Sequence, residues 1–470
     1  MHEALTDRRG RPVSRRRFLA AAAAALVVPR GRGVAPSVEP LRPVPSAAQL
    51  EWQRDERAVF VHFGLNTFTN REWGDGREDP RLFAPTRLDP RQWARAARAG
   101  GFRAMILTAK HHDGFCLWPT ATTSHSVSAS PWRQGGGDVV REFVTASRAE
   151  GLKAGVYLSP WDRHEPRYGD SPAYNDFYCA QLQELLTRYG PVHEVWFDGA
   201  NGEGPNGKKQ AYDWPRVWRL VRQLQPDAVI FSDAGPDVRW IGNESGLAGD
   251  PNWSTVDPAV VLYPGASGSA VSRMLQHGDP AGSVWRPGET DVSIRPGWFH
   301  HPAEDERVRA IDNLVDLYFS SVGRNSKLLL NVPPTRDGVF HLTDVTRLTG
   351  MRERLAALFH EDVTRGHQLV WQPAGDRTTA EIDLGRAVHV GIADLREDVT
   401  RGQRVTRYAL DGSNGGPWLP LSRGTTIGFR KLDRFDATPV RRVRLTVDAI
   451  DTPLPVRLAL YAADVTGAHE

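Results

Sequence analysis

Short apolar runs alternate with segments of helical periodicity between residues 59 and 332, and this alternation constrains the fold more than any other feature of the sequence. Runs typical of buried strands lie at 59–64, 104–109, 153–159, 194–197, 229–232, 238–241, 291–294 and 328–332. Amphipathic helices are predicted at 90–99, 139–150, 173–189, 214–224 and 304–320. About eight strands that alternate with helices predict an α/β fold, a (β/α)8-like barrel of the TIM type.

A doubly wound open sheet is the alternative, because the later strands are less regularly spaced than the earlier ones. No glycine-rich phosphate loop follows the first strand, so no motif supports the interpretation of this chain as a nucleotide-binding protein.

The pattern changes after about residue 360 to short alternating strands without helical periodicity. These strands lie at 367–371, 379–383, 388–393, 405–410, 425–431, 440–447 and 456–462. Their spacing predicts a C-terminal β-sandwich domain of roughly one hundred residues. We therefore expect a signal and linker at 1–36, a catalytic barrel at 46–358 and a β-sandwich accessory domain at 362–470.

The N-terminus has the order of a twin-arginine (Tat) export signal. Residues 14–19 read Ser-Arg-Arg-Arg-Phe-Leu, and a modest apolar run follows at 20–28, before Pro29. This run is too short to span a membrane stably, and a basic disordered tail is the alternative. The sequence therefore predicts an extracytoplasmic protein, periplasmic or secreted, without a membrane span in the mature chain.

Composition excludes some classes of partner. A formal net charge of +3 over 470 residues, with dispersed arginines, gives no case for nucleic acid. The 15 tryptophans give mild support to a carbohydrate site. The two cysteines, Cys116 and Cys179, are too few for a disulfide framework or a cysteine-rich metal site. We expect two unpaired buried thiols, with a single bridge between them as the alternative.

Candidate polar residues recur where predicted strands end, which is where a barrel builds its site. His62 ends the first strand, His111 and His112 follow the second, Trp161 follows the third, and Asp198 follows the fourth. A single histidine of this kind is more often a core residue, and a single aspartate can simply cap a loop. Together they indicate a site.

Adjacent histidines point in different directions if the chain stays extended, which suits separate hydrogen bonds better than one metal ion. We therefore expect no metal and no cofactor, and a metal-dependent hydrolase that uses the histidine pair is the alternative. Glycoside cleavage without a metal needs two carboxyl groups. Asp198 suits the charged one. Glu244, near Trp240, and Glu289 are rivals for the protonated one, and the spacing does not decide between them.

Four motifs together resemble glycoside hydrolase family 29, the α-L-fucosidases, across residues 52–332. They are His62-Phe63-Gly64, Glu72-Trp73, Lys110-His111-His112-Asp113-Gly114-Phe115 and Val195-Trp196-Phe197-Asp198-Gly199. The resemblance implies a retaining double displacement with Asp198 as the nucleophile. It also implies that His62, His111 and His112 hold the hydroxyls of fucose and that Glu72, Trp73 and Trp196 line the same pocket.

Residues 242–246 and 291–299 are similar to the branch of that family that cleaves α-1,3- and α-1,4-linked fucose from branched, Lewis-type glycans. That resemblance implies that Glu244 is the acid/base and that Trp161 and Trp298 contact the galactose and N-acetylglucosamine side of the bond. The expected partners are fucosylated oligosaccharides or glycoconjugates. A broad aryl- and α-1,2-fucosidase is the nearest alternative, and a secreted glycan-binding protein with a degenerate barrel is a second. We expect the C-terminal domain to pack against the barrel rather than bind sugar.

Overall fold

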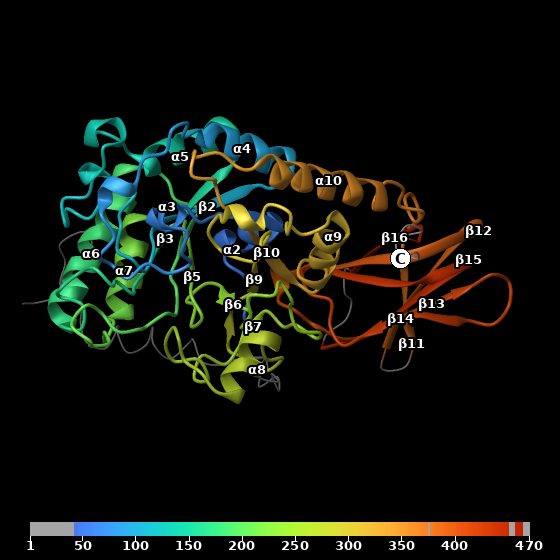
Figure 1. Cartoon of the computed structure of the whole chain (residues 1–470). Coiled ribbons are helices and arrows are strands. Elements are labelled where there is room, and N and C mark those ends of the chain that lie inside the picture. The colour runs from blue at the N-terminus through green and yellow to red at the C-terminus, as the bar shows by residue number, and fades with distance from the viewer. Residues whose placement is uncertain (1–41, 375–376, 451–455, 464–470) are drawn as a thin grey trace, which may run out of the picture. The chain divides into compact units, whose positions relative to one another are not determined.

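The computed structural model describes residues 42–374, 377–450 and 456–463 (Figure 1). The predicted export signal at 1–36 lies outside the described residues. Among the described residues no helix combines the length and the hydropathy needed to cross a bilayer.

Eight parallel strands form one sheet, in the order β5-β4-β3-β2-β1-β10-β9-β6. A parallel bridge between Phe231 at the end of β5 and Val238 just before β6 brings the two edges of this sheet together, so the barrel is nearly closed. The predicted barrel is confirmed, and each of its predicted strands overlaps an observed one. The strands are β1 Arg57–Val61, β2 Ala104–Lys110, β3 Lys153–Leu158, β4 Glu194–Trp196, β5 Val229–Phe231, β6 Arg239–Trp240, β9 Gly288–Ser293 and β10 Ser326–Asn331.

The helices of the barrel begin where aspartates can cap them. Asp89, Asp138 and Asp213 each accept a backbone N–H in the first turn of α4, α5 and α7. The α-helices are α2 Ala47–Arg54, α3 Leu65–Thr69, α4 Pro90–Ala99, α5 Val139–Ala149, α6 Ser171–Arg188, α7 Trp214–Leu224, α8 Ser269–His277, α9 Ile311–Ser320 and α10 Leu342–Leu358. A short hairpin, β7 Thr255–Val256 with β8 Val284–Trp285, lies in the connection from β6 to β9.

One predicted helix, 304–320, is wrong in its first half, because α9 starts only at Ile311. Pro302–Glu304 forms a separate single turn, and Arg309 then follows the sheet edge, where its backbone N–H donates to Ile294 O (3.0 Å) and its Nε to Ser293 O (2.8 Å). These tertiary hydrogen bonds override the local helical pattern.

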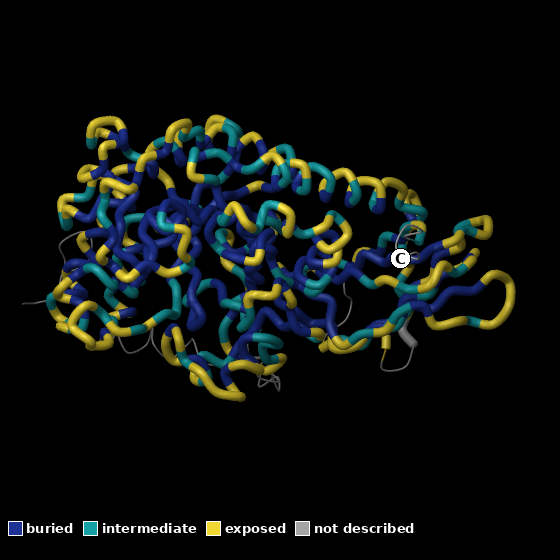
Figure 2. The backbone as a smooth tube through the Cα atoms, viewed as in Figure 1, coloured by how far each residue is buried: buried dark blue, intermediate teal, exposed yellow. Residues whose placement is uncertain are grey.

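The barrel strands pack against one apolar core on their outer face and a second one on their inner face, and they are buried along most of their length (Figure 2). The larger core fills the space between strands and helices. A smaller one, which includes Trp52, Phe60, Tyr157, Trp196 and Phe231, fills the barrel interior. The interior therefore is a packed core, and only the ends of the strands are free to build a site.

The C-terminal domain is a six-stranded antiparallel sheet. Its strands are β11 Val370–Ala374, β12 Arg377–Glu397, β13 Val405–Ser413, β14 Leu419–Gly424, β15 Lys431–Ala449 and β16 Val456–Tyr461. The predicted strands 379–383 and 388–393 are parts of one long strand, β12, which continues through two register shifts against β15. The sheet has its own apolar core. The limits predicted for the domains stay a prediction.

Arg430 ties this sheet domain to the barrel. Its guanidinium donates to both carboxylate oxygens of Glu56, just before β1, at 2.9 Å, and to Asp394 Oδ2 at 2.8 Å. Tyr318 of α9 donates to the same Glu56 at 2.6 Å. These contacts agree with a C-terminal domain that packs on the barrel. Cys116 and Cys179 are both free and buried, as expected.

Candidate active site

Asp198 lies directly after β4, with 28% of its side chain exposed. Tyr157 O–H donates to its Oδ2 at 3.1 Å, and the backbone N–H of Ala200 donates to its Oδ1 at 2.7 Å. His112 Nε2 lies 3.9 Å from the same Oδ2. Both oxygens are thus oriented by neutral donors, which leaves the carboxylate fixed in direction and still accessible.

Three buried histidines line the site beside Asp198. The ring centroids of His111 and His112 lie 4.1 Å apart, and those of His62 and His111 lie 5.6 Å apart. The adjacent pair is expected to point apart if the chain stays extended, but the strand ends at Lys110, so this condition is not met at His111 and His112. Desolvation lowers the pKa of His62 to about 3 and lowers the pKa of His111 and His112 as well. The three rings are therefore neutral near pH 7.

The hydrogen bonds behind the rings fix the tautomers of two of them. Asn331 uses its amide N–H groups on Ser293 Oγ and Trp298 O, so its oxygen accepts from His62 Nδ1 (2.8 Å). Ser159 O–H donates to Trp161 O, so its oxygen accepts from His112 Nδ1 (2.7 Å). In both neutral rings Nε2 is then an acceptor, suited to a ligand hydroxyl.

An aromatic wall stands next to His112. The Trp161 ring lies 4.9 Å from the His112 ring, and Trp73, 60% exposed, lies 6.0 Å from Trp161 and 6.3 Å from His112. Trp161 is held by a hydrogen bond from its indole N–H to Glu203 O (3.0 Å). The structure thus brings both predicted tryptophans next to the His112 ring.

Glu244 lies at the rim, after β6, and its Oε2 is 3.4 Å from the indole N–H of Trp298. Desolvation of the carboxyl group raises the pKa of Glu244, and the negative charges of Asp198 and Glu72 add to this, while the Trp298 N–H opposes it. Trp240, expected near Glu244, donates to Asp291 Oδ1 at 2.7 Å, and burial, together with the charge of Glu244, raises the pKa of Asp291. Desolvation of Glu244 by Trp240 stays a prediction.

Glu289, the rival acid, is in the wrong place to meet a substrate. It is fully buried in the barrel interior, where Trp196 Nε1 donates to it at 3.0 Å and Lys327 Nζ lies 3.6 Å away. Trp196, expected to line the pocket, also lies in this interior and stacks on Phe231 with ring centroids 4.1 Å apart. The geometry therefore favours Glu244 over Glu289 and places Trp196 beneath the site.

Glu72 holds a loop by its carboxylate. Its oxygens accept the backbone N–H groups of Trp298 (2.8 Å) and Phe299 (3.2 Å) and a hydrogen bond from His301 Nε2 (2.6 Å). These contacts show that Glu72 orients the loop that carries Trp298. Its place in the lining of the fucose pocket, which the resemblance implies, stays a prediction.

Two further carboxyl groups at the strand ends were missed in the sequence. Asp233 follows β5 and accepts the N–H of Gly265 (2.8 Å), and burial, with repulsion from Asp198, raises its pKa to about 6. Asp291 lies in β9, where burial raises its pKa well above the usual range. Their positions at or near the ends of parallel strands were a usable signal, the same one that identified Asp198.

Within residues 42–374, 377–450 and 456–463, no three or more His, Cys, Asp or Glu side chains lie together in a way that could hold a metal ion.

Comparison with known proteins identifies the family of the chain. The family model for α-L-fucosidases matches residues 44–357. Alpha-L-fucosidase 1 of Arabidopsis thaliana is 41% identical over 460 residues, which cover 91% of this chain and 89% of that protein. A relative from Oryza sativa subsp. japonica that carries the same enzyme name is 45% identical over 437 residues, 87% of this chain and 83% of that one. The crystal structure of a glycoside hydrolase 29 family member from an unknown rumen bacterium is 41% identical, with a TM-score of 0.83 over 92% of this chain and 80% of that chain. The chain therefore belongs to glycoside hydrolase family 29, the α-L-fucosidases.

Proposed function

We propose that this protein is a retaining exo-α-L-fucosidase that removes terminal α-1,3- or α-1,4-linked fucose from branched, Lewis-type glycans. The observation that carries the proposal is the contrast between its two carboxyl groups. Asp198 is partly exposed and accepts one hydrogen bond on each of its oxygens, which aims the carboxylate as a nucleophile needs, whereas desolvation raises the pKa of Glu244 and favours its protonated form. A retaining glycosidase needs one group of each kind.

In the first step Asp198 attacks C1 of fucose while Glu244 gives its proton to the departing glycosidic oxygen. In the second step Glu244 takes a proton from water, whose oxygen attacks C1 and releases Asp198. Retention predicts that the two carboxyl groups lie about 5 to 5.5 Å apart when the sugar is bound.

The neutral histidines supply the fucose side of the pocket. With Nδ1 of His62 and His112 engaged by Asn331 and Ser159, each Nε2 can accept a hydrogen bond from a fucose hydroxyl. Trp73, Trp161 and Trp298 supply apolar faces of the kind on which sugar rings pack.

The linkage preference is supported by residues 242–246 and 291–299 and by the position of Trp298 against Glu244. The test is release of free fucose from a Lewis-type trisaccharide, a 2′-linked fucosyllactose and 4-nitrophenyl α-L-fucoside, with the Asp198→Ala variant as control. Release chiefly from the trisaccharide supports the proposal. Release chiefly from the other two would make the protein a broad fucosidase, and no release from any would favour a glycan-binding protein.

We also propose export through the twin-arginine pathway, which is supported by the sequence of residues 14–28. Replacing Arg15 and Arg16 with lysine should keep the enzyme in the cytoplasmic fraction of a host that has this pathway. Unchanged export of the variant would contradict the proposal.

A further inference from the structure

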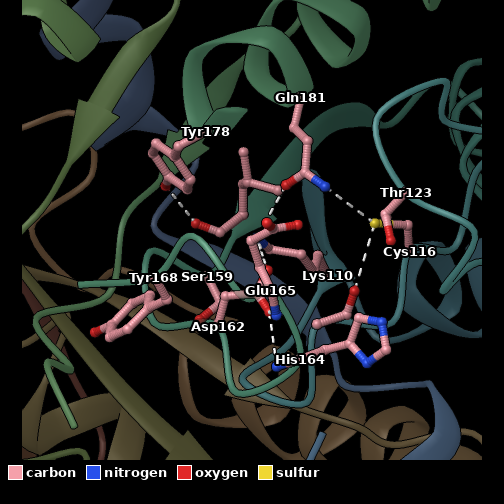
Figure 3. A network of polar contacts seen from close by, with 12 residues as sticks. Lys110, Cys116, Thr123, Ser159, Asp162, His164, Glu165, Tyr168, Tyr178 and Gln181 are labelled. Atoms are coloured by element: carbon pink, nitrogen blue, oxygen red, sulfur yellow. Dashed lines mark hydrogen bonds and ion pairs between the residues drawn. The ribbon is translucent and has the colours of Figure 1, made fainter. Parts of the chain in front are cut away.

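A fully buried ion pair lies behind the site. Lys110 Nζ donates to Asp162 Oδ2 and to Gln181 Oε1, each at 2.9 Å, and at most 2% of either charged side chain is exposed (Figure 3). The lysine also lies 5.5 Å from the ring centroid of Tyr178 and 5.6 Å from that of Phe177. No solvent reaches this pair, so its geometry is fixed by the protein alone.

The two partners belong to the two segments that build the site. Lys110 ends β2 and directly precedes His111 and His112. Asp162 directly follows Trp161, and its Oδ1 accepts the backbone N–H groups of His164 (3.0 Å) and Glu165 (2.9 Å). The ion pair therefore joins the start of the histidine segment to the turn that carries Trp161.

The surrounding residues leave this connection little freedom. A Cβ at Gly114 would come within 2.4 Å of Asp162 Oδ1, so only glycine lets the histidine loop pack against the carboxylate. Gln181, from α6, also donates to Thr122 Oγ1 at 3.1 Å and to Cys116 Sγ at 3.4 Å. Burial alone would raise the pKa of Asp162, but the Lys110 ammonium and the backbone N–H groups lower it, so the carboxylate of Asp162 stays charged.

We propose that Lys110, Asp162 and Gln181 form a positioning device that sets the distance between the His112 ring, on the fucose side of the scissile bond, and the Trp161 indole, on the leaving-group side. The inference rests on the proposed function. A substrate that spans both sides, such as a Lewis-type trisaccharide, depends on this distance. An aryl fucoside depends mainly on the fucose side.

The chain offers a matched control in a second buried ion pair. Lys327 Nζ and Glu194 Oε2 are also 2.9 Å apart, with at most 1% of either side chain exposed, but they lie in the barrel interior. The test compares two neutralised pairs, Lys110→Met with Asp162→Asn, and Lys327→Met with Glu194→Gln. The amide oxygen that Asp162→Asn introduces can still accept from the turn, so the first variant removes the link to Lys110 while keeping the turn's acceptor.

The readout is the ratio of kcat/KM on the trisaccharide to kcat/KM on 4-nitrophenyl α-L-fucoside. We expect this ratio to fall by about tenfold to a hundredfold in the Lys110 and Asp162 variant, because small displacements of positioning residues have effects of this size. We expect it to change by less than about threefold in the interior variant, because removing that pair displaces neither the histidine segment nor the turn that carries Trp161.

An unchanged ratio in the Lys110 and Asp162 variant, or an equal fall in the interior variant, would overturn the inference and leave the proposed function intact. If the first variant does not fold, Gln181→Leu replaces it, because it removes one hydrogen bond of Lys110 and keeps the ion pair. In Gln181→Leu, a fall in the ratio of the two kcat/KM values that is smaller than the fall expected for the Lys110 and Asp162 variant supports the inference. An unchanged ratio overturns it. A wild-type protein that releases no fucose from either substrate would overturn the proposed function, and this inference with it.

Discussion

The mouth and the interior of the barrel both hold carboxyl groups close together, but only the interior pair has a buried cation beside it. In the interior, Glu194 and Glu289 share the ammonium of Lys327, at 2.9 and 3.6 Å. At the mouth, the basic side chain described within 4 Å of the Asp198 carboxylate is His112, and burial lowers the pKa of its ring. Repulsion from Asp198 helps to raise the pKa of Glu244. A carboxyl group that is fully buried beside a cation cannot meet a substrate, whereas one left without a cation in a partly desolvated site is available for proton transfer and attack.

The largest effect should come from Asp198→Ala. The variant removes the attacking oxygen, so kcat on every fucoside should fall on the order of 10⁴-fold or more. The melting temperature should change little, because the side chain is partly exposed and lies at a strand end. Turnover of 4-nitrophenyl α-L-fucoside and a thermal melt measure the two quantities. Activity within tenfold of wild type would show that the mouth carboxylate is not the nucleophile.

The next largest effect should distinguish Glu244 from Glu289 as the acid, when each is replaced in turn by glutamine. Glu244→Gln should lower kcat/KM on the trisaccharide by on the order of 10² to 10⁴-fold and affect the aryl fucoside much less, since a good leaving group needs little protonation. Glu289→Gln keeps the acceptor for Trp196 and should leave both substrates within a few fold of wild type. A reversed result, with the larger loss at Glu289, would contradict the division between mouth and interior.

A third effect concerns stability and pH. Burial lowers the pKa of His62 to about 3 in the folded protein, so its ring stays neutral down to about that pH. In the unfolded chain the ring has the ordinary histidine pKa of about 6.5 and takes up a proton there. Stability is therefore lost as the pH falls below about 6.5, on the order of 3 kcal/mol between pH 7 and pH 4 for this one group. Urea unfolding at several pH values should show a shallower dependence in His62→Gln than in wild type. The His360→Gln variant, outside the site, is the control, and equal slopes in all three proteins would contradict the claim.

The smallest effect should come from Trp298→Phe. This change removes the N–H that stabilises the charged form of Glu244, so the pKa of Glu244 should rise. Because Glu244 must be protonated to act as the acid, the alkaline limb of kcat/KM on the trisaccharide should move to higher pH by a fraction of a unit. A shift to lower pH would show that the indole mainly desolvates the carboxyl group.

The sequence predicted which residues lie at the strand ends better than it predicted the hydrogen bonds between them and the loops. Asp198 and His112 could be found because the carboxyl ends of the strands in a parallel barrel all lie at the face where such enzymes build their sites. The same rule could have found Asp233. By contrast, the hydrogen bonds of Glu72 to the loop around Trp298 and of Trp240 to Asp291 could not be predicted, because these partners lie far away along the chain. Such contacts depend on tertiary geometry, which local patterns do not encode.

The same limit explains the errors in the fold. The helical pattern of residues 304–320 is genuine, but hydrogen bonds from Arg309 to the edge of β9 prevent a helix before Ile311. Glu289 looked like an equal rival of Glu244 because burial in the barrel interior cannot be seen from spacing alone.

The central claim, that Asp198 is the nucleophile of a retaining fucosidase, is tested most directly by trapping the intermediate. The protein is incubated with a 2-deoxy-2-fluoro-α-L-fucosyl fluoride, whose fluorine at C2 slows both steps while the fluoride at C1 leaves readily, and the labelled peptide is identified by mass spectrometry. The account predicts a fucosyl ester on Asp198. An adduct on another carboxylate, such as Asp233 or Glu289, would contradict it.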